Sequence, residues 1–105
     1  MKIKPQFTIH QAVEVLRHEL SSHIKVIPRK NIFDKSLQWI DVDKNAFVGV
    51  RVYFYLDQPL VDTYVPNFFA RMFFGGLISG IFHHAARSEF KDQIERFIKT
   101  EFYME

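Results

Sequence analysis

The stretch Phe47–Leu56, FVGVRVYFYL, decides the fold because apolar side chains alternate along its whole length. A strand places successive side chains on opposite faces, so every second residue here lies on one apolar face. The side chains expected on that face are Val48, Val50, Val52, Phe54 and Leu56. A strand with one wholly apolar face indicates an antiparallel sheet that packs that face against a core.

Turn residues bound this strand on both sides and predict further strands before and after it. Asp43–Asn45 precede the strand and Asp57–Pro59 follow it. Pro28 marks a sheet edge or the end of pairing. Short connections favour pairing between consecutive strands, which predicts a four-stranded antiparallel meander. The three other strands are expected at Ile24–Val26, Leu37–Val42 and Leu60–Val65.

Helical periodicity flanks the meander at both ends. Apolar residues recur at helical spacing from Thr8 to Ser22, where Thr8 and Gln11 fit a capping box. After Pro66 the sequence predicts two helices, Asn67–Ala85 and Ser88–Tyr103. The predicted fold is therefore a single α+β domain over residues 1–105. It has an N-terminal helix, the four-stranded meander, and two C-terminal helices that cover one sheet face.

Composition supports one globular core and excludes several classes of protein. The chain has 105 residues, of which 48% are hydrophobic and 25% charged, an ordinary globular balance. It has no cysteine, which rules out disulfides, thiolate zinc sites and cysteine nucleophiles. The formal net charge of +2 is small for a dedicated nucleic-acid binder. The start of the chain lacks the layout of a secretory signal, so we expect a cytoplasmic protein.

The sequence predicts neither catalytic nor metal-binding residues. It has no Gly-rich phosphate loop, no Gly-x-Ser-x-Gly elbow and no His-Glu-x-x-His motif. His10, Glu14 and His18 form one helical stripe, but this stripe lies away from the apolar face and should be solvated. We therefore expect no cofactor and a non-enzymatic role. Four aspartates gather around the expected strand ends, where we interpret them as turn residues: Asp41, Asp43, Asp57 and Asp62.

The second face of the central strand is the first candidate contact surface. Phe47, Arg51, Tyr53 and Tyr55 lie at alternate positions, a pattern also found where single-stranded nucleic acids stack on aromatic rings. The small net charge and the nearby aspartates disfavour nucleic acid. Aromatic residues on both faces of a strand indicate that a second sheet or subunit covers the outer face.

The apolar run from Phe68 to Ala86 is the second candidate contact surface. Its uncharged centre, Met72–Phe82, is only eleven residues long, which favours a buried helix over a membrane span. Gly76 and Gly80 form a small-residue ridge that would let another backbone approach closely. The alternative is a bend at Gly75 and Gly76 between two shorter helices.

Self-association is the function that these patterns favour. Seventeen aromatic residues, 16% of the chain, are difficult to bury within one domain of this size. We therefore expect a small self-associating domain that uses the outer strand face or the glycine-bearing helix. The alternative is a binding module for an apolar small molecule or a membrane surface, through a pocket or the apolar helix 68–86. Peripheral membrane contact is left open by this alternative.

Overall fold

The structure is a computed structural model that describes residues 2–34, 37–45, 48–64, 66 and 68–104, with the backbone alone for residues 68–84. The described residues form two helices and six strands. The helices are α1 (Ile9–Glu19) and α2 (Phe68–Phe102). The strands are β1 (Lys2–Ile3), β2 (Lys25–Lys30), β3 (Gln38–Asp43), β4 (Gly49–Phe54), β5 (Pro59–Tyr64) and β6 (Tyr103–Met104). Their order along the chain is β1-α1-β2-β3-β4-β5-α2-β6.

The main sheet is the predicted antiparallel meander, with the strand order β2-β3-β4-β5. Strand β2 continues through Pro28, which lies opposite Ile40, and its pairing extends to Lys30 opposite Gln38. The proline therefore marks an edge strand and does not end the pairing. An edge strand tolerates proline because its outer row of backbone groups needs no partner strand.

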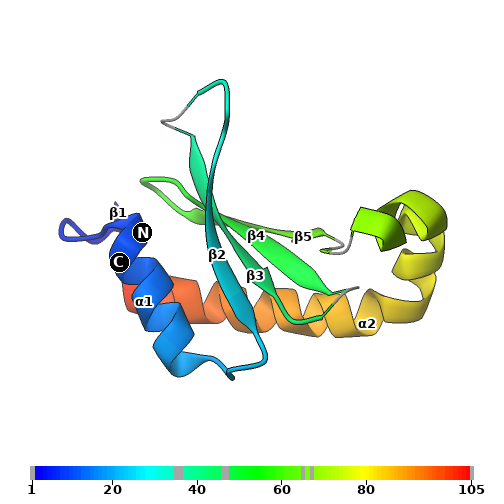
Figure 1. The fold of residues 1–105 in the computed structure, drawn as a ribbon. Coiled ribbons are helices and arrows are strands. Elements are labelled where there is room, and N and C mark those ends of the chain that lie inside the picture. Colours follow the sequence, from blue (N-terminus) through cyan, green and yellow to red (C-terminus); the bar gives the residue numbers. More distant parts are fainter. Residues whose placement is uncertain (1, 35–36, 46–47, 65, 67, 105) are drawn as a thin grey trace.

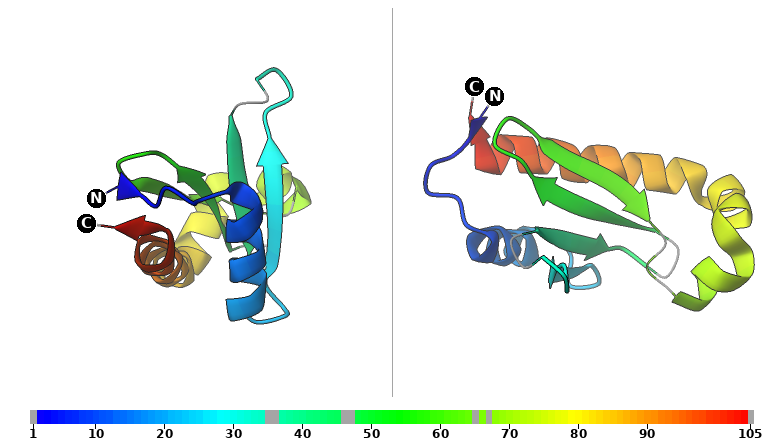
Figure 2. Two further views of the ribbon diagram at one scale, coloured as in Figure 1. Left: turned by 90° about the vertical axis from the view of Figure 1, so that its left-hand side faces the viewer. Right: turned by 90° about the horizontal axis from the view of Figure 1, so that it is seen from above.

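One face of this sheet, the closed face, packs against the helices. Helix α1 and the long straight part of α2 lie on this same side of the sheet (Figures 1 and 2). Val50 and Val52 are fully buried here, as the alternation predicts. Leu56, expected on the same face, lies beyond the end of β4 and is 76% exposed. The other closed-face side chains of the core are Val26, Ile40, Val42 and Val61.

Helix α1 begins as the sequence predicts. Thr8 is its N-cap, and the Thr8 hydroxyl accepts a hydrogen bond of 3.1 Å from the Gln11 amide. This bond satisfies one of the amides that a helix start leaves without an intrahelical partner. The helix buries Ala12, Val13 and Leu16, so its apolar stripe faces the sheet.

The prediction of two C-terminal helices is wrong, because α2 is one continuous helix from Phe68 to Phe102. Its first part turns away from the axis of the long straight part (Figure 1). The predicted break at Ala86–Ser88 contains neither glycine nor proline, and alanine is the best helix former, so the helical hydrogen bonds continue. The later half buries Phe90, Ile94 and Ile98. Within the described residues, no helix is long and apolar enough to cross a membrane.

The two ends of the chain form a second small sheet that the sequence does not reveal. Strand β1 pairs antiparallel with β6, with Lys2 opposite Met104. The Ile3 amide also donates to the Leu56 carbonyl at 2.9 Å, and the Tyr103 hydroxyl donates to the Tyr55 carbonyl at 2.7 Å. Burial raises the pKa of Tyr103 to about 12. Both ends are thereby fastened to the turn between β4 and β5.

Candidate interaction surface

The second face of the main sheet, here called the open face, is set by the strand register. Side chains that alternate with the core residues lie on it in three rows that run across the four strands. The first row is Lys25, Asp43, Gly49 and Tyr64. The second row is Ile27, Asp41, Arg51 and Asp62. The third row is Arg29, Trp39, Tyr53 and Leu60.

A buried carboxylate lies at the centre of the open face. Asp41 is only 2% exposed. Its Oδ2 accepts a hydrogen bond of 3.2 Å from Arg29 Nε, and its Oδ1 lies 3.3 Å from Arg51 Nε. A buried carboxylate is tolerated when cations neutralise it, and two guanidinium groups do so here. Both arginines are thus engaged with a carboxylate of their own chain.

Arg51 also stacks against aromatic rings on either side of it. Its guanidinium carbon lies 4.5 Å from the centre of the Tyr64 ring and 5.8 Å from that of Trp39. A guanidinium over the face of an aromatic ring is attracted by the ring quadrupole. Arg51 is thus held by a carboxylate and two rings, which fixes the central part of the open face.

Tyr64 and Asp43 form a second polar pair at the end of the sheet where Gly49 lies. The Tyr64 hydroxyl donates a hydrogen bond to Asp43 Oδ1. A Cβ at Gly49 would lie 2.6 Å from Pro66 Cγ and 2.9 Å from Tyr64 Cε1, so the tyrosine ring crosses the strand because the residue there is glycine. Burial raises the pKa of Asp43, although the Tyr64 hydrogen bond opposes that shift. Burial and the Asp43 hydrogen bond raise the pKa of Tyr64, so its hydroxyl stays protonated.

Beside these polar pairs the open face carries an apolar strip, here called the aromatic row: Trp39, Tyr53, Tyr55 and Leu60. The rings of Trp39 and Tyr53 lie 5.8 Å apart between centres, and Tyr53 and Tyr55 stack at 6.4 Å. Tyr55 is 51% exposed and Leu60 is 49% exposed. The row therefore offers apolar surface that is about half-exposed at Tyr55 and Leu60 and more covered at Trp39 and Tyr53.

The structure brings together part of the predicted outer-strand surface. Arg51 and Tyr53 lie on the open face, and Tyr55 follows directly after β4 on the same side. Phe47 lies outside the described residues. Gly76 and Gly80 are within α2, but the side chains around them lie outside the description, so the predicted ridge stays a prediction.

The interpretation of the aspartates as turn residues is wrong for three of them. Asp41 lies inside β3, and Asp62 lies inside β5 opposite Arg51. Asp43 is the last residue of β3 and accepts the Tyr64 hydrogen bond. Sequence reasoning also missed Trp39, Tyr64 and Arg29 as parts of this surface. A signal was present, because polar or aromatic residues alternate with Ile40 and Val42 along the third predicted segment.

The histidine stripe of α1 lies in solvent. His10 Nε2 and Glu14 Oε1 are 3.2 Å apart, and both side chains are exposed. Among the residues that the structure describes, no three histidine or acidic side chains gather in a way that could hold a metal ion.

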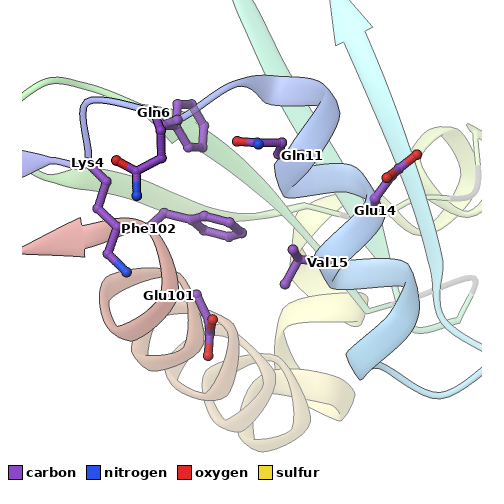
Figure 3. Close-up of a pocket in the computed structure, with 8 residues that line it drawn as sticks. Lys4, Gln6, Gln11, Glu14, Val15, Glu101 and Phe102 are labelled. Atoms are coloured by element: carbon purple, nitrogen blue, oxygen red, sulfur yellow. The ribbon is translucent and has the colours of Figure 1, made fainter.

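A cavity of about 240 Å³ lies between the N-terminal segment, α1 and the end of α2 (Figure 3). Phe7, Val15 and Phe102 supply its apolar part. Its other lining residues are polar: Lys4, Gln6, Gln11, Glu14 and Glu101. Pockets that bind drug-sized ligands usually measure about 300–1,000 Å³, so this cavity is small for such a ligand.

Comparisons of the chain with protein families, with curated proteins and with solved structures give no match. The open face is therefore the feature of the chain that points to a function.

Proposed function

We propose that this domain is a non-enzymatic module that self-associates, with the open face of the main sheet as its contact surface. The observation that carries the proposal is the aromatic row, in which Tyr53 and Tyr55 stack and in which Tyr55 and Leu60 stay about half-exposed. Aromatic side chains dominate the energetics of protein interfaces because they bury much apolar area for little loss of conformational entropy.

The charges on the open face favour a second copy of this chain as the partner. Edge strand β2 carries Lys25 and Arg29 toward this face, whereas edge strand β5 carries Asp62. Two such faces related by a two-fold axis parallel to the strands place β2 of one copy over β5 of the other. The basic edge then meets the acidic edge, and the aromatic rows meet each other.

Internal pairing of the arginines argues against nucleic acid on the same surface. Arg29 and Arg51 both contact Asp41, so a carboxylate of the same chain already neutralises one of their two positive charges. Nucleic-acid affinity depends on cations that are free to neutralise phosphates. A protein partner whose surface carries charges of both signs therefore fits the open face better than a polyanionic nucleic acid does.

Sedimentation at micromolar concentration tests the proposal. We expect a mass of twice 12.5 kDa for the unaltered chain. Tyr53→Glu should raise the dissociation constant about a hundredfold, because it replaces a stacked ring by a charge at the centre of the aromatic row. High salt should weaken association only modestly, since screening acts on the edge charges and leaves the apolar contact.

Gln93→Glu is the matched control, because it adds the same charge on an exposed position of α2. Its mass should equal that of the unaltered chain, and both variants should keep the same circular dichroism spectrum. A monodisperse monomer of the unaltered chain would overturn self-association. An equal effect of both substitutions would instead remove the open face as its location.

A further inference from the structure

The tip of the β2–β3 hairpin presents two apolar side chains to solvent. Ile32 is 84% exposed and Phe33 is 92% exposed. The hairpin extends away from the body formed by the helices and the sheet (Figure 1). Large apolar residues that are almost fully exposed and adjacent mark a surface that meets an apolar partner.

Local hydrogen bonds hold this tip in shape. The side-chain oxygen of Asn31 accepts from the Phe33 amide at 2.8 Å and from the Asp34 amide at 3.1 Å. The Asn31 amide donates to the Leu37 carbonyl at 3.0 Å, which closes the loop. The exposed pair therefore lies on an ordered turn, and little conformational entropy is lost when it binds.

Basic residues lie on the strand that leads to the tip. Residues 25–34 contain Lys25, Arg29 and Lys30 against the single acidic residue Asp34. Arg29 already pairs with Asp41 and Lys25 lies at the other end of β2, so Lys30 supplies the basic charge next to the tip. Lys30 is exposed at the end of β2, directly before the tip. Basic side chains behind an exposed apolar tip complement a surface with anionic groups at its edge and hydrocarbon beneath.

We propose that Ile32 and Phe33 insert into a lipid surface that contains anionic headgroups, with Lys30 held at the headgroup level. The area of the tip favours lipid over a second copy of the chain. One large side chain buries roughly 150–250 Å², so two fall well short of the ~800 Å² per partner of a stable protein interface. A bilayer accepts a narrow tip without needing a complementary partner surface.

Sedimentation with vesicles tests the tip. Vesicles of phosphatidylcholine with about one third phosphatidylglycerol should bind the full chain, and pure phosphatidylcholine vesicles should bind it less, because each basic side chain contributes through the anionic lipid. The double variant Ile32→Ser, Phe33→Ser should lower the partition coefficient at least about tenfold. Lys30→Gln should lower it about fivefold, and high salt should reproduce much of that loss.

A unique label reports which part of the molecule enters the lipid. The chain has no cysteine, so Phe33→Cys and, as a matched control, Leu56→Cys can each carry one environment-sensitive fluorophore. Leu56 is also an exposed apolar residue, but it lies at the β4–β5 turn. We expect a blue shift with anionic vesicles for the label at Phe33 and none for the label at Leu56.

Three results would overturn the proposal. They are failure of the unaltered chain to bind anionic vesicles, equal binding by the Ile32→Ser, Phe33→Ser variant, and a spectral shift at Leu56 without one at Phe33. The thermal unfolding midpoint of each variant should match that of the unaltered chain, because Ile32 and Phe33 are almost wholly exposed. None of these results depends on whether the open face self-associates.

Discussion

The two faces of the main sheet bury their side chains by different means. On the closed face, Ile40 and Val42 are covered by helices. On the open face, Asp41 lies between them in the sequence and is almost as deeply buried, but there it contacts two arginines, and aromatic rings flank Arg51. The comparison shows that burial alone does not identify the hydrophobic core. On the closed face, the buried side chains are apolar and are stabilised by the apolar area that the helices cover. On the open face, the buried side chain is a carboxylate and is stabilised by the positive charges of two arginines.

The largest effect should come from the closed face. Ile40→Ala should lower the free energy of unfolding by about 2–5 kcal/mol, because it removes buried methylene groups and leaves a cavity. Ile27→Ala is the matched change, since Ile27 lies on the open face and is only partly buried. Urea unfolding should show a clearly smaller loss for Ile27→Ala. Equal losses would contradict the division of the sheet into two faces.

A smaller effect is expected at the buried charge of the open face. Asp41→Ala should lower the free energy of unfolding by about 1–3 kcal/mol, because it removes the partner of two arginines. The loss stays below that for a wholly buried ion pair, since Arg29 is 52% exposed and can regain water. In the Arg29→Ala background the same substitution should cost less. Additive losses in this double-mutant cycle would show that Asp41 and Arg29 do not act together.

The smallest effect should depend on pH and concerns Asp43. Burial raises the folded-state pKa of this carboxyl, so its ionised form costs stability at neutral pH. The cost is absent below the unfolded value of 3.8 and appears as pH rises through the folded value. Asp43→Asn should therefore be more stable than the unaltered chain at pH 7, and the gap should close on acidification.

Urea unfolding at neutral and acidic pH measures this gap for Asp43→Asn. Asp57→Asn serves as a control for net charge, because Asp57 is exposed in the β4–β5 turn. An Asp43→Asn variant less stable than the unaltered chain at pH 7 would mean that the carboxylate's hydrogen bond from Tyr64 outweighs its desolvation.

The meander and the closed face could be predicted because their signal is local. Val50 and Val52 alternate within one segment, and Thr8 caps its own helix. The polar centre of the open face could not be predicted in the same way. Asp41 meets Arg29 across a hairpin whose loop is long enough to allow several registers, so the sequence does not fix the pairing.

The other errors follow from signals that are weak over short stretches. Strands β1 and β6 have two residues each, too few to show any period. Ser88 suggests a helix start, yet serine is tolerated within a helix when the residues around it are strong helix formers.

The pairing of β1 with β6 also constrains the order in which the chain folds. Lys2 and Met104 are separated by nearly the whole sequence, and closing so long a loop in an unfolded chain carries a large entropic cost. Once the meander and α2 have formed, their ends already lie near each other and little of that cost is left. We therefore expect this small sheet to close last during folding and to open first under native conditions, with fast exchange of the Lys4 amide, which donates to the Phe102 carbonyl. Strands β1 and β6 would then separate and pair again while the main sheet stays folded.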